Sequence, residues 1–275
     1  MDLFSRDRWH QYVERLTGDR ATGATDLIDQ VLLERRYWPV FQPIRDLESN
    51  RIVGYEAFSR FDAPLTTQRL FDHAGVVGRG MDLEVATMTA AVKAAVELPS
   101  DCWVSVNSSA TLLSETDTIG AILDPLDRPV VLELSEYEII TDAEPIVSAM
   151  ERLGDGRMLA VDDAGAGLAS LRNILEVRPA YVKMDLGLVQ GVATDLSRRA
   201  LLAGMVHFAR EADVALVGMG IQNEDDLETL KDLGVALGQG YLLGRPERVA
   251  FLEDQRGTAP ARASRRRAPA RAQHT

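Results

Sequence analysis

The sequence predicts an α/β fold, a (β/α)8 TIM-like barrel whose first strand runs antiparallel to the others. The chain has 275 residues, close to the length of about 250 residues that is typical of one such barrel. Eight short apolar segments alternate with amphipathic helical stretches, a pattern typical of a parallel sheet covered by helices. The connection between the first two segments, residues 45–51, is too short for a parallel crossover, so these two strands are expected to form a hairpin.

Each predicted strand is an apolar run bounded by polar or turn-forming residues. The hairpin between the first two strands turns at Glu48-Ser49-Asn50. Helical periodicity separates most of the later strands, as in residues 197–210 and 224–233. The predicted strands are residues 38–44, 52–58, 103–106, 130–134, 158–161, 181–184, 214–217 and 235–237.

The two ends of the chain differ in composition from its middle. Residues 1–20 are polar and charged, with Trp9, Tyr12 and Leu16 spaced for one face of a helix. After a Gly/Thr-rich break, residues 26–35 are predicted to form a helix with one apolar side. Residues 253–275 are rich in Ala, Pro and Arg, a composition that cannot form a core. We therefore expect an N-terminal helical extension over residues 1–25, a barrel domain over 26–252 and a basic disordered tail over 253–275.

The charge of the chain limits its partners. The net charge is −12, although residues 256–275 hold six Arg and no acid. An acidic body repels nucleic acid, so we expect contact with nucleic acid, if any, only through the Arg-rich tail, which is otherwise a solvated extension. No apolar run approaches the roughly 18 residues of a membrane helix, and Met1-Asp2-Leu3 does not begin a signal peptide. These features predict a cytoplasmic protein without membrane contact.

Polar residues stand at the ends of most predicted strands. In a (β/α)8 barrel the carboxyl ends of the strands meet in one mouth, where active sites lie. A single acid at such a position is more often a turn or cap residue, but the coincidence on several strands favours a site. These residues are Glu56, Asn107, Glu133, Asp162, Asp163, Lys183, Asp185 and Gln239.

Four of these acids, Glu56, Glu133, Asp162 and Asp163, would converge in the mouth and require a compensating cation. Ligand sets made only of oxygen select a hard divalent ion, so the sequence predicts Mg²⁺ or Mn²⁺. Lys183 adds one positive charge, and a metal ion together with this lysine favours a phosphate ligand in the mouth. The four histidines lie on none of the strand ends, and Cys102 is the only cysteine, which argues against histidine-centred chemistry and excludes a thiolate cluster.

Seven short segments, spread over residues 26–246, resemble the motifs of the EAL family of cyclic di-GMP phosphodiesterases in order and spacing. They are Phe41-Gln42-Pro43-Ile44 for Y-Q-P-I, Tyr55-Glu56-Ala57-Phe58-Ser59-Arg60 for E-A-L and its following Arg, Val106-Asn107-Ser108-Ser109 for N-x-S, Glu133-Leu134-Ser135-Glu136 for E-x-T-E, Lys183-Met184-Asp185 for K-I-D, Gln239-Gly240-Tyr241 for Q-G-Y and Gly244-Arg245-Pro246 for G-R-P.

The resemblance implies a role for each matched residue. Lys183 would orient the attacking water or the phosphate, and Glu136 would hold the loop after the fifth strand. Asp163 would belong to a second metal site. The implied ligands of the first metal ion are Glu56, Asn107, Glu133 and Asp162. The implied contacts of cyclic di-GMP are Gln42, Arg60, Asp185, Gln239 and Pro246, with Arg60 suited to a phosphate because its fork donates two hydrogen bonds.

Two segments depart from the family pattern. Met219 and Gln222 replace both glutamates of the family's A-E-G-V-E segment, which here is Gly218-Met219-Gly220-Ile221-Gln222. A thioether is a poor ligand for a hard ion, and Gln222 lacks the charge, so the second metal site is expected to be weakened. The family's D-D-F-G-T-G-Y is Asp162-Asp163-Ala164-Gly165-Ala166-Gly167-Leu168 here, without its aromatic residues and its Thr.

Three functions remain open on the sequence. The first is a degenerate EAL domain that binds cyclic di-GMP or serves as a signalling module with little or no phosphodiesterase activity. The second is an active, metal-dependent phosphodiesterase that yields linear pGpG. The third is a scaffold that binds only proteins. The lost glutamates favour the first function over the second, and the retained acids favour it over the third.

The resemblance also implies a homodimer, paired through residues 172–178 and 195–199. Residues 1–25 leave no room for a regulatory domain, so we expect control by a protein partner or by oligomerisation.

Overall fold

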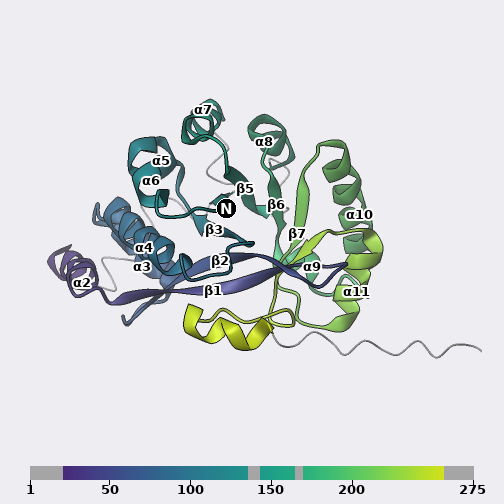
Figure 1. Ribbon diagram of the computed structural model, residues 1–275, viewed down its shortest axis with the longest axis horizontal. Coiled ribbons are helices and arrows are strands. Elements are labelled where there is room, and N and C mark those ends of the chain that lie inside the picture. The colour runs from purple at the N-terminus through teal and green to yellow at the C-terminus, as the bar shows by residue number, and fades with distance from the viewer. Residues whose placement is uncertain (1–20, 136–142, 165–169, 257–275) are drawn as a thin grey trace, which may run out of the picture.

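The computed structural model describes residues 21–135, 143–164 and 170–256. Eight strands form one closed barrel in which each strand pairs with its neighbours in the sequence, and helices surround it (Figure 1). The predicted fold is therefore confirmed. The strands are β1 (Tyr37–Asp46), β2 (Ile52–Phe61), β3 (Trp103–Asn107), β4 (Val130–Ser135), β5 (Arg157–Ala164), β6 (Tyr181–Met184), β7 (Ala215–Gly218) and β8 (Leu237–Gly238).

The first strand is reversed, as the short connection predicts. β1 pairs antiparallel with β2 through the register Gln42↔Glu56, and it closes the barrel by antiparallel pairing with β8. The neighbouring pairs from β2 to β8 are all parallel. Because parallel strands share one direction, the carboxyl ends of β2–β8 lie at one end of the barrel.

The helices cover the outer face of the barrel. From β2 onward, helices alternate with strands along the chain, and α2 lies before β1. They are α2 (Ala21–Leu33), α3 (Thr67–Val76), α4 (Gly80–Ala95), α5 (Ala110–Ser114), α6 (Thr116–Leu123), α7 (Glu144–Leu153), α8 (Ser170–Val177), α9 (Leu186–Val189), α10 (Leu196–Glu211) and α11 (Glu224–Leu233), with the 3-10 helix η1 (Val249–Arg256) at the end.

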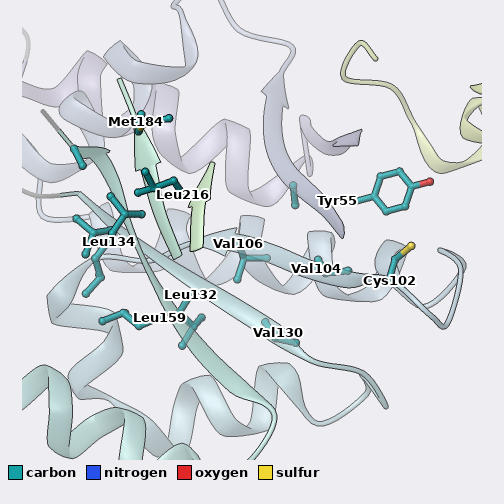
Figure 2. Packing of buried hydrophobic residues seen from close by; sticks show 14 of the residues in the cluster. Tyr55, Cys102, Val104, Val106, Val130, Leu132, Leu134, Leu159, Met184 and Leu216 are labelled. Carbon is teal, nitrogen blue, oxygen red and sulfur yellow. The ribbon is translucent and has the colours of Figure 1, made fainter. Parts of the chain in front are cut away.

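Alternation along the strands divides the side chains into two cores. Val104, Val106, Leu132 and Leu134 belong to the large core between the strands and the helices (Figure 2). The opposite faces of the strands fill the barrel, where Trp103 stacks near Tyr181 with ring centroids 5.0 Å apart. This inner cluster forms an apolar floor, whose buried members are Ile44, Val217 and Leu237 and whose partly buried members include Val53, Trp103, Tyr181 and Met219.

One glycine is required by this floor. A Cβ atom on Gly54 would lie 2.4 Å from ring atoms of Trp103, so the indole occupies the space that any other residue at position 54 would need.

The eighth strand begins later than predicted. The amide of Val235 donates to the carbonyl of Leu230 and so still closes α11, which leaves only Leu237 and Gly238 in the ladder. The predicted helix at residues 26–35 is observed as α2, Ala21–Leu33. The predicted helical spacing of Trp9, Tyr12 and Leu16, and the Arg-rich tail beyond residue 256, lie outside the described residues.

Candidate metal centre at the carboxyl end of the barrel

A buried polar layer lies within the barrel at the ends of its strands. Glu56, Glu133, Lys183 and Gln239 are each 1–2% exposed. They point inward by the same alternation that places Trp103, Tyr181 and Val217 in the floor. Glu56 pairs in register with Ser105, and Glu133 pairs with Asn107, so neighbouring strands bring these distant sequence positions together.

Lys183 is the cation of this layer. Its Nζ lies 2.6 Å from Glu133 Oε2, 2.8 Å from Glu56 Oε2 and 3.7 Å from Asp162 Oδ2. Burial alone would lower the pKa of Lys183, but the negative charges of Glu133, Glu56 and Asp162 outweigh it and raise that pKa. Lys183 is therefore fully protonated at neutral pH.

Glu133 is the carboxyl group whose ionised form is destabilised by this arrangement. Burial raises the pKa of its carboxyl group well above the usual range, and the charges of Glu56 and Asp162 raise it further against the opposing charge of Lys183. A second cation would relieve this repulsion, because several carboxylates at close range need more than one compensating charge.

Three carboxylates meet the geometric requirement for a metal ion. Glu56, Glu133 and Asp162 each offer one oxygen, and the three oxygens lie within 4.8 Å of one another. Oxygen-only donors suit a hard ion such as Mg²⁺ or Mn²⁺. Gln239 Oε1 is buried without a hydrogen-bond partner among the described residues, so one further oxygen near the cluster remains unsatisfied. The donor set therefore fits a divalent cation.

Two amides, Gln42 on β1 and Gln239 directly after β8, support the cluster. Gln239 Nε2 donates to Glu56 Oε2 at 2.8 Å and to Gln42 Oε1 at 3.0 Å. Gln42 in turn donates to the carbonyl of Gly244 at 2.9 Å. Pro246 is half-buried two residues further on. This chain of hydrogen bonds fixes Glu56 and ties the segment after β8 to the mouth.

Asp163 lies beside the cluster and not within it. Its φ of 57° places it in the left-handed region, where the ladder between β5 and β6 shifts register. Its amide donates to Asp162 Oδ1 at 2.9 Å. Burial raises the pKa of Asp163, and the charges of Asp162 and Asp185 raise it further.

A pocket of about 460 Å³ opens from the acidic cluster toward α3 and α4. Asn107, predicted as a metal ligand, lines this pocket at the exposed end of β3, and so does Arg60. The guanidinium of Arg60 lies 5.8 Å from the centre of the Phe58 ring. The pocket therefore joins carboxylates, an amide, a guanidinium and an aromatic ring.

Asp185 has a structural partner. Its Oδ1 accepts the amide of Gly187 at 2.8 Å and caps α9. Glu136 lies outside the described residues, as does the loop at 165–169. The predicted roles of Glu136 and of that loop therefore stay predictions.

The two replaced glutamate positions differ in environment. Met219 is partly buried and packs against the apolar floor formed by Ile44, Val217 and Leu237. Gln222 is exposed after the end of β7. Gly220, between them, accepts a hydrogen bond from Gln190 Nε2 at 3.1 Å. At the position of the first lost glutamate, the chain thus presents an apolar side chain that belongs to the barrel core.

The sequence reasoning missed one contact at this end of the barrel. Glu84 on α4 bonds Ser109 directly after β3. The position of Glu84 inside a helix does not indicate a functional site in the sequence. Only its hydrogen bonds to Ser109, 25 residues away, reveal the contact.

Residues 27–246 match a family model described as "EAL domain". The bifunctional diguanylate cyclase/cyclic di-GMP phosphodiesterase MucR of Pseudomonas aeruginosa is 26% identical over 238 residues, which are 78% of this chain and 34% of MucR. The blue light- and temperature-regulated antirepressor BluF of Escherichia coli is 26% identical over 222 residues, 74% of this chain and 53% of BluF. This chain therefore spans about a third of one relative and about half of the other.

Among solved structures, the cyclic di-GMP complex of the PaMucR phosphodiesterase superposes with a TM-score of 0.73. The two share 23% sequence identity, and the match covers 84% of this chain and 99% of that one. At this identity the likeness establishes the fold. Within the described residues, no helix is long and apolar enough to cross a membrane.

Proposed function

Because this chain belongs to the EAL domain family, we propose that it is a degenerate member which binds cyclic di-GMP or serves as a signalling module, with little or no phosphodiesterase activity. The observation that carries the proposal is the packing of Met219 into the apolar floor. At that position the EAL pattern has a glutamate linked to the second metal ion.

The loss of this ligand acts on hydrolysis more than on binding. Two-metal hydrolysis uses both ions, to activate water and to stabilise the leaving oxygen. Met219 offers no anionic oxygen, and Gln222 offers no charge. The expected loss is on the order of 10²–10⁴ in rate. Asp163 alone is a weak second site, so we propose one firmly bound Mg²⁺ or Mn²⁺ and one weakly bound ion.

The residues proposed for ligand binding are all retained. Glu56, Asn107, Glu133 and Asp162 would hold the first ion, which neutralises their charge and polarises a phosphate when bound. Lys183 and Arg60 would face phosphate oxygens. The remaining proposed contacts are Gln42, Asp185, Gln239 and Pro246. The pocket of about 460 Å³ beside the carboxylates supports binding of an organic phosphate there.

Two alternatives follow from specific observations. An active phosphodiesterase remains a candidate because Glu56, Glu133, Asp162 and Lys183 form one connected cluster. A scaffold for protein partners is a candidate because a relative of similar identity, BluF, is named as an antirepressor. A carboxylate cluster buried around one lysine is costly and has no use in a pure scaffold, so we favour the binding module.

Calorimetric titration with cyclic di-GMP tests this proposal. We expect saturable binding in Mg²⁺ that weakens at least tenfold in EDTA, because the first ion would bridge the carboxylates and the phosphate. Glu133→Gln is expected to abolish the effect of Mg²⁺, whereas Glu97→Gln, an exposed glutamate after α4, is expected to keep it. Binding that is absent in both conditions would leave the scaffold as the better function.

We further propose a homodimer. The elements after β5 and β6 carry four exposed leucines, more apolar surface than isolated surface residues need. They are Leu175 on α8, Leu186 on α9, and Leu196 and Leu201 on α10, which are 50–79% exposed. Two of them lie beside or within the segments 172–178 and 195–199 for which the resemblance implies pairing. A regulatory protein partner on the same surface is an alternative.

Sedimentation velocity tests the dimer. We expect a dimer at micromolar concentration, and we expect Leu196→Glu to yield a monomer with unchanged circular dichroism, because it places a charge in the buried interface. Leu33→Glu on α2, equally exposed at 83%, is the matched control and is expected to stay dimeric. A native chain that sediments as a monomer at high micromolar concentration would refute the dimer.

The domain organisation also stays a proposal. We propose a barrel domain over residues 26–252, preceded by a helical extension over 1–25 and followed by a basic tail over 253–275. Residues 253–256 of that tail belong to η1, and we propose that the rest of it is disordered. Only through that tail would the chain contact nucleic acid. A cytoplasmic location accords with the absence of a membrane-spanning helix from the described residues.

A further inference from the structure

Glu84 makes a two-point contact with the chain segment that follows β3. Its Oε1 accepts the backbone amide of Ser109 at 2.5 Å, and its Oε2 accepts the Ser109 hydroxyl at 2.7 Å. The two residues are 25 positions apart and come from α4 and from the start of α5. Both are half-buried, so water screens the contact only in part.

The hydrogen bonds of Ser109 are all satisfied when Glu84 is ionised. The Ser109 hydroxyl accepts the amide of Leu112 at 3.0 Å and thereby caps α5, so its single proton is directed to Glu84. Both oxygens of Glu84 consequently face donors. A carboxylate accepts at both oxygens, whereas a glutamine side chain would turn an NH₂ group toward one of the donors.

This contact holds the short turn that carries Asn107. β3 ends at Asn107, and Ser108 donates its amide to the carbonyl of Glu133 at 2.9 Å. Ser109 follows, and its amide and hydroxyl both bond Glu84. One end of the turn is therefore tied to β4 and the other to α4, with the Asn107 side chain at the pocket between them.

We propose that Glu84 is a positioning residue for the metal centre, which orients Asn107 through Ser109 and does not itself bind the ion. The inference rests on the proposed metal site. Partners that orient ligands in this way typically change metal affinity by about 10–100-fold when they are removed.

A purely structural role explains the geometry less well. Burial raises the pKa of Glu84, against the lowering effect of the Ser109 hydrogen bonds, so the carboxylate is held at a cost in this environment. The Ser109 hydroxyl already caps α5 by accepting the amide of Leu112. The additional carboxylate constrains the turn and not the helix, and that turn leads directly to Asn107.

Mn²⁺ titration of the intact chain, monitored by calorimetry and by electron paramagnetic resonance, tests the inference. Glu84→Gln is expected to weaken Mn²⁺ affinity by about 10–100-fold. Ser109→Thr keeps both donors and is expected to bind within about threefold of the native chain, whereas Ser109→Ala loses one donor and is expected to fall between. Glu97→Gln, which changes an exposed glutamate just after α4, controls for the loss of a negative charge.

The outcomes separate this inference from the site on which it rests. Melting in EDTA and circular dichroism identify variants that fail to fold, and affinities are compared at a temperature where all are folded. If the native chain binds Mn²⁺, Glu133→Gln abolishes binding and Glu84→Gln binds like the native chain, the inference alone is wrong. If the native chain binds no Mn²⁺, the metal site and the inference are both wrong. Equal losses of Mn²⁺ affinity in Glu84→Gln and Glu97→Gln would also overturn the inference about Glu84, since the loss of a negative charge alone would then explain the effect.

Discussion

The double variant Met219→Glu/Gln222→Glu is expected to hydrolyse cyclic di-GMP about 10²–10⁴ times faster than the native chain in saturating Mg²⁺ or Mn²⁺. Met219 packs as part of the apolar floor and offers no ligand to a hard ion. A carboxylate at position 219 would supply the missing anionic oxygen, and one at position 222 would restore the charge that the EAL pattern has there.

The single variants are expected to act unequally, because residues that work as a unit are not additive. Met219→Glu alone is expected to raise metal occupancy more than rate. Met219→Gln with Gln222→Glu, which adds polarity at 219 without charge, is the matched control and is expected to stay slow. Product formation is measured by chromatography of linear pGpG, and ion stoichiometry by calorimetry.

Two results would contradict this account. A native chain that turns over at about 1 s⁻¹ or faster would mean that the two replaced glutamates do not impair catalysis. A double variant that binds two ions and remains inert would mean that the altered segment 163–168 is the deeper cause, which favours the scaffold function.

Lys183→Met is expected to lower the free energy of unfolding by about 3–5 kcal/mol in EDTA at pH 7, the usual cost of leaving buried charges without their partner. Glu56 and Glu133 would remain 1–2% exposed with like charges at close range. Protonation of Glu133, whose pKa is raised by burial and by the charges of Glu56 and Asp162, would relieve the repulsion. We therefore expect the variant to regain stability as the pH falls, because its folded state then binds more protons than its unfolded state.

In the native chain, the stabilising contribution of Lys183 itself is expected not to change across neutral pH. The pKa of Lys183 is raised in the folded state, where the charges of Glu133, Glu56 and Asp162 outweigh burial. Its stabilising contribution is therefore fully present below the unfolded lysine pKa of about 10.4 and is lost only above it.

Chemical denaturation with and without Mg²⁺ measures this prediction. We expect Mg²⁺ to stabilise Lys183→Met more than the native chain, because the ion replaces the missing cation and binds only the folded state. Lys231→Met removes an exposed ion pair with Glu228 and is expected to change stability by no more than about 1 kcal/mol. Equal losses in the two variants would show that the Lys183 cluster is not a special source of stability.

Local patterns in the sequence were sufficient for the fold. Alternation of apolar residues and the spacing of the helices predict a barrel, and the short connection at residues 45–51 predicts the reversed first strand; the pairing of β1 with β2 and β8 confirms it. The sequence determined the boundaries of the strands less well than their number and order. Residue 235 is apolar enough for a strand, but its amide completes α11, and a pattern of side chains does not reveal where a backbone amide donates.

The candidate site was likewise predicted only in part from the sequence. The sequence itself placed Glu56, Glu133, Asp162 and Lys183 at strand ends, because the carboxyl ends of parallel strands meet in one mouth. Only the tertiary structure decided that Lys183 bridges Glu56 and Glu133, that Met219 joins the apolar floor and that Glu84 reaches Ser109. These contacts join positions that are far apart in the chain. Their existence depends on interatomic distances that the closure of the barrel sets, and no spacing within one segment contains that information.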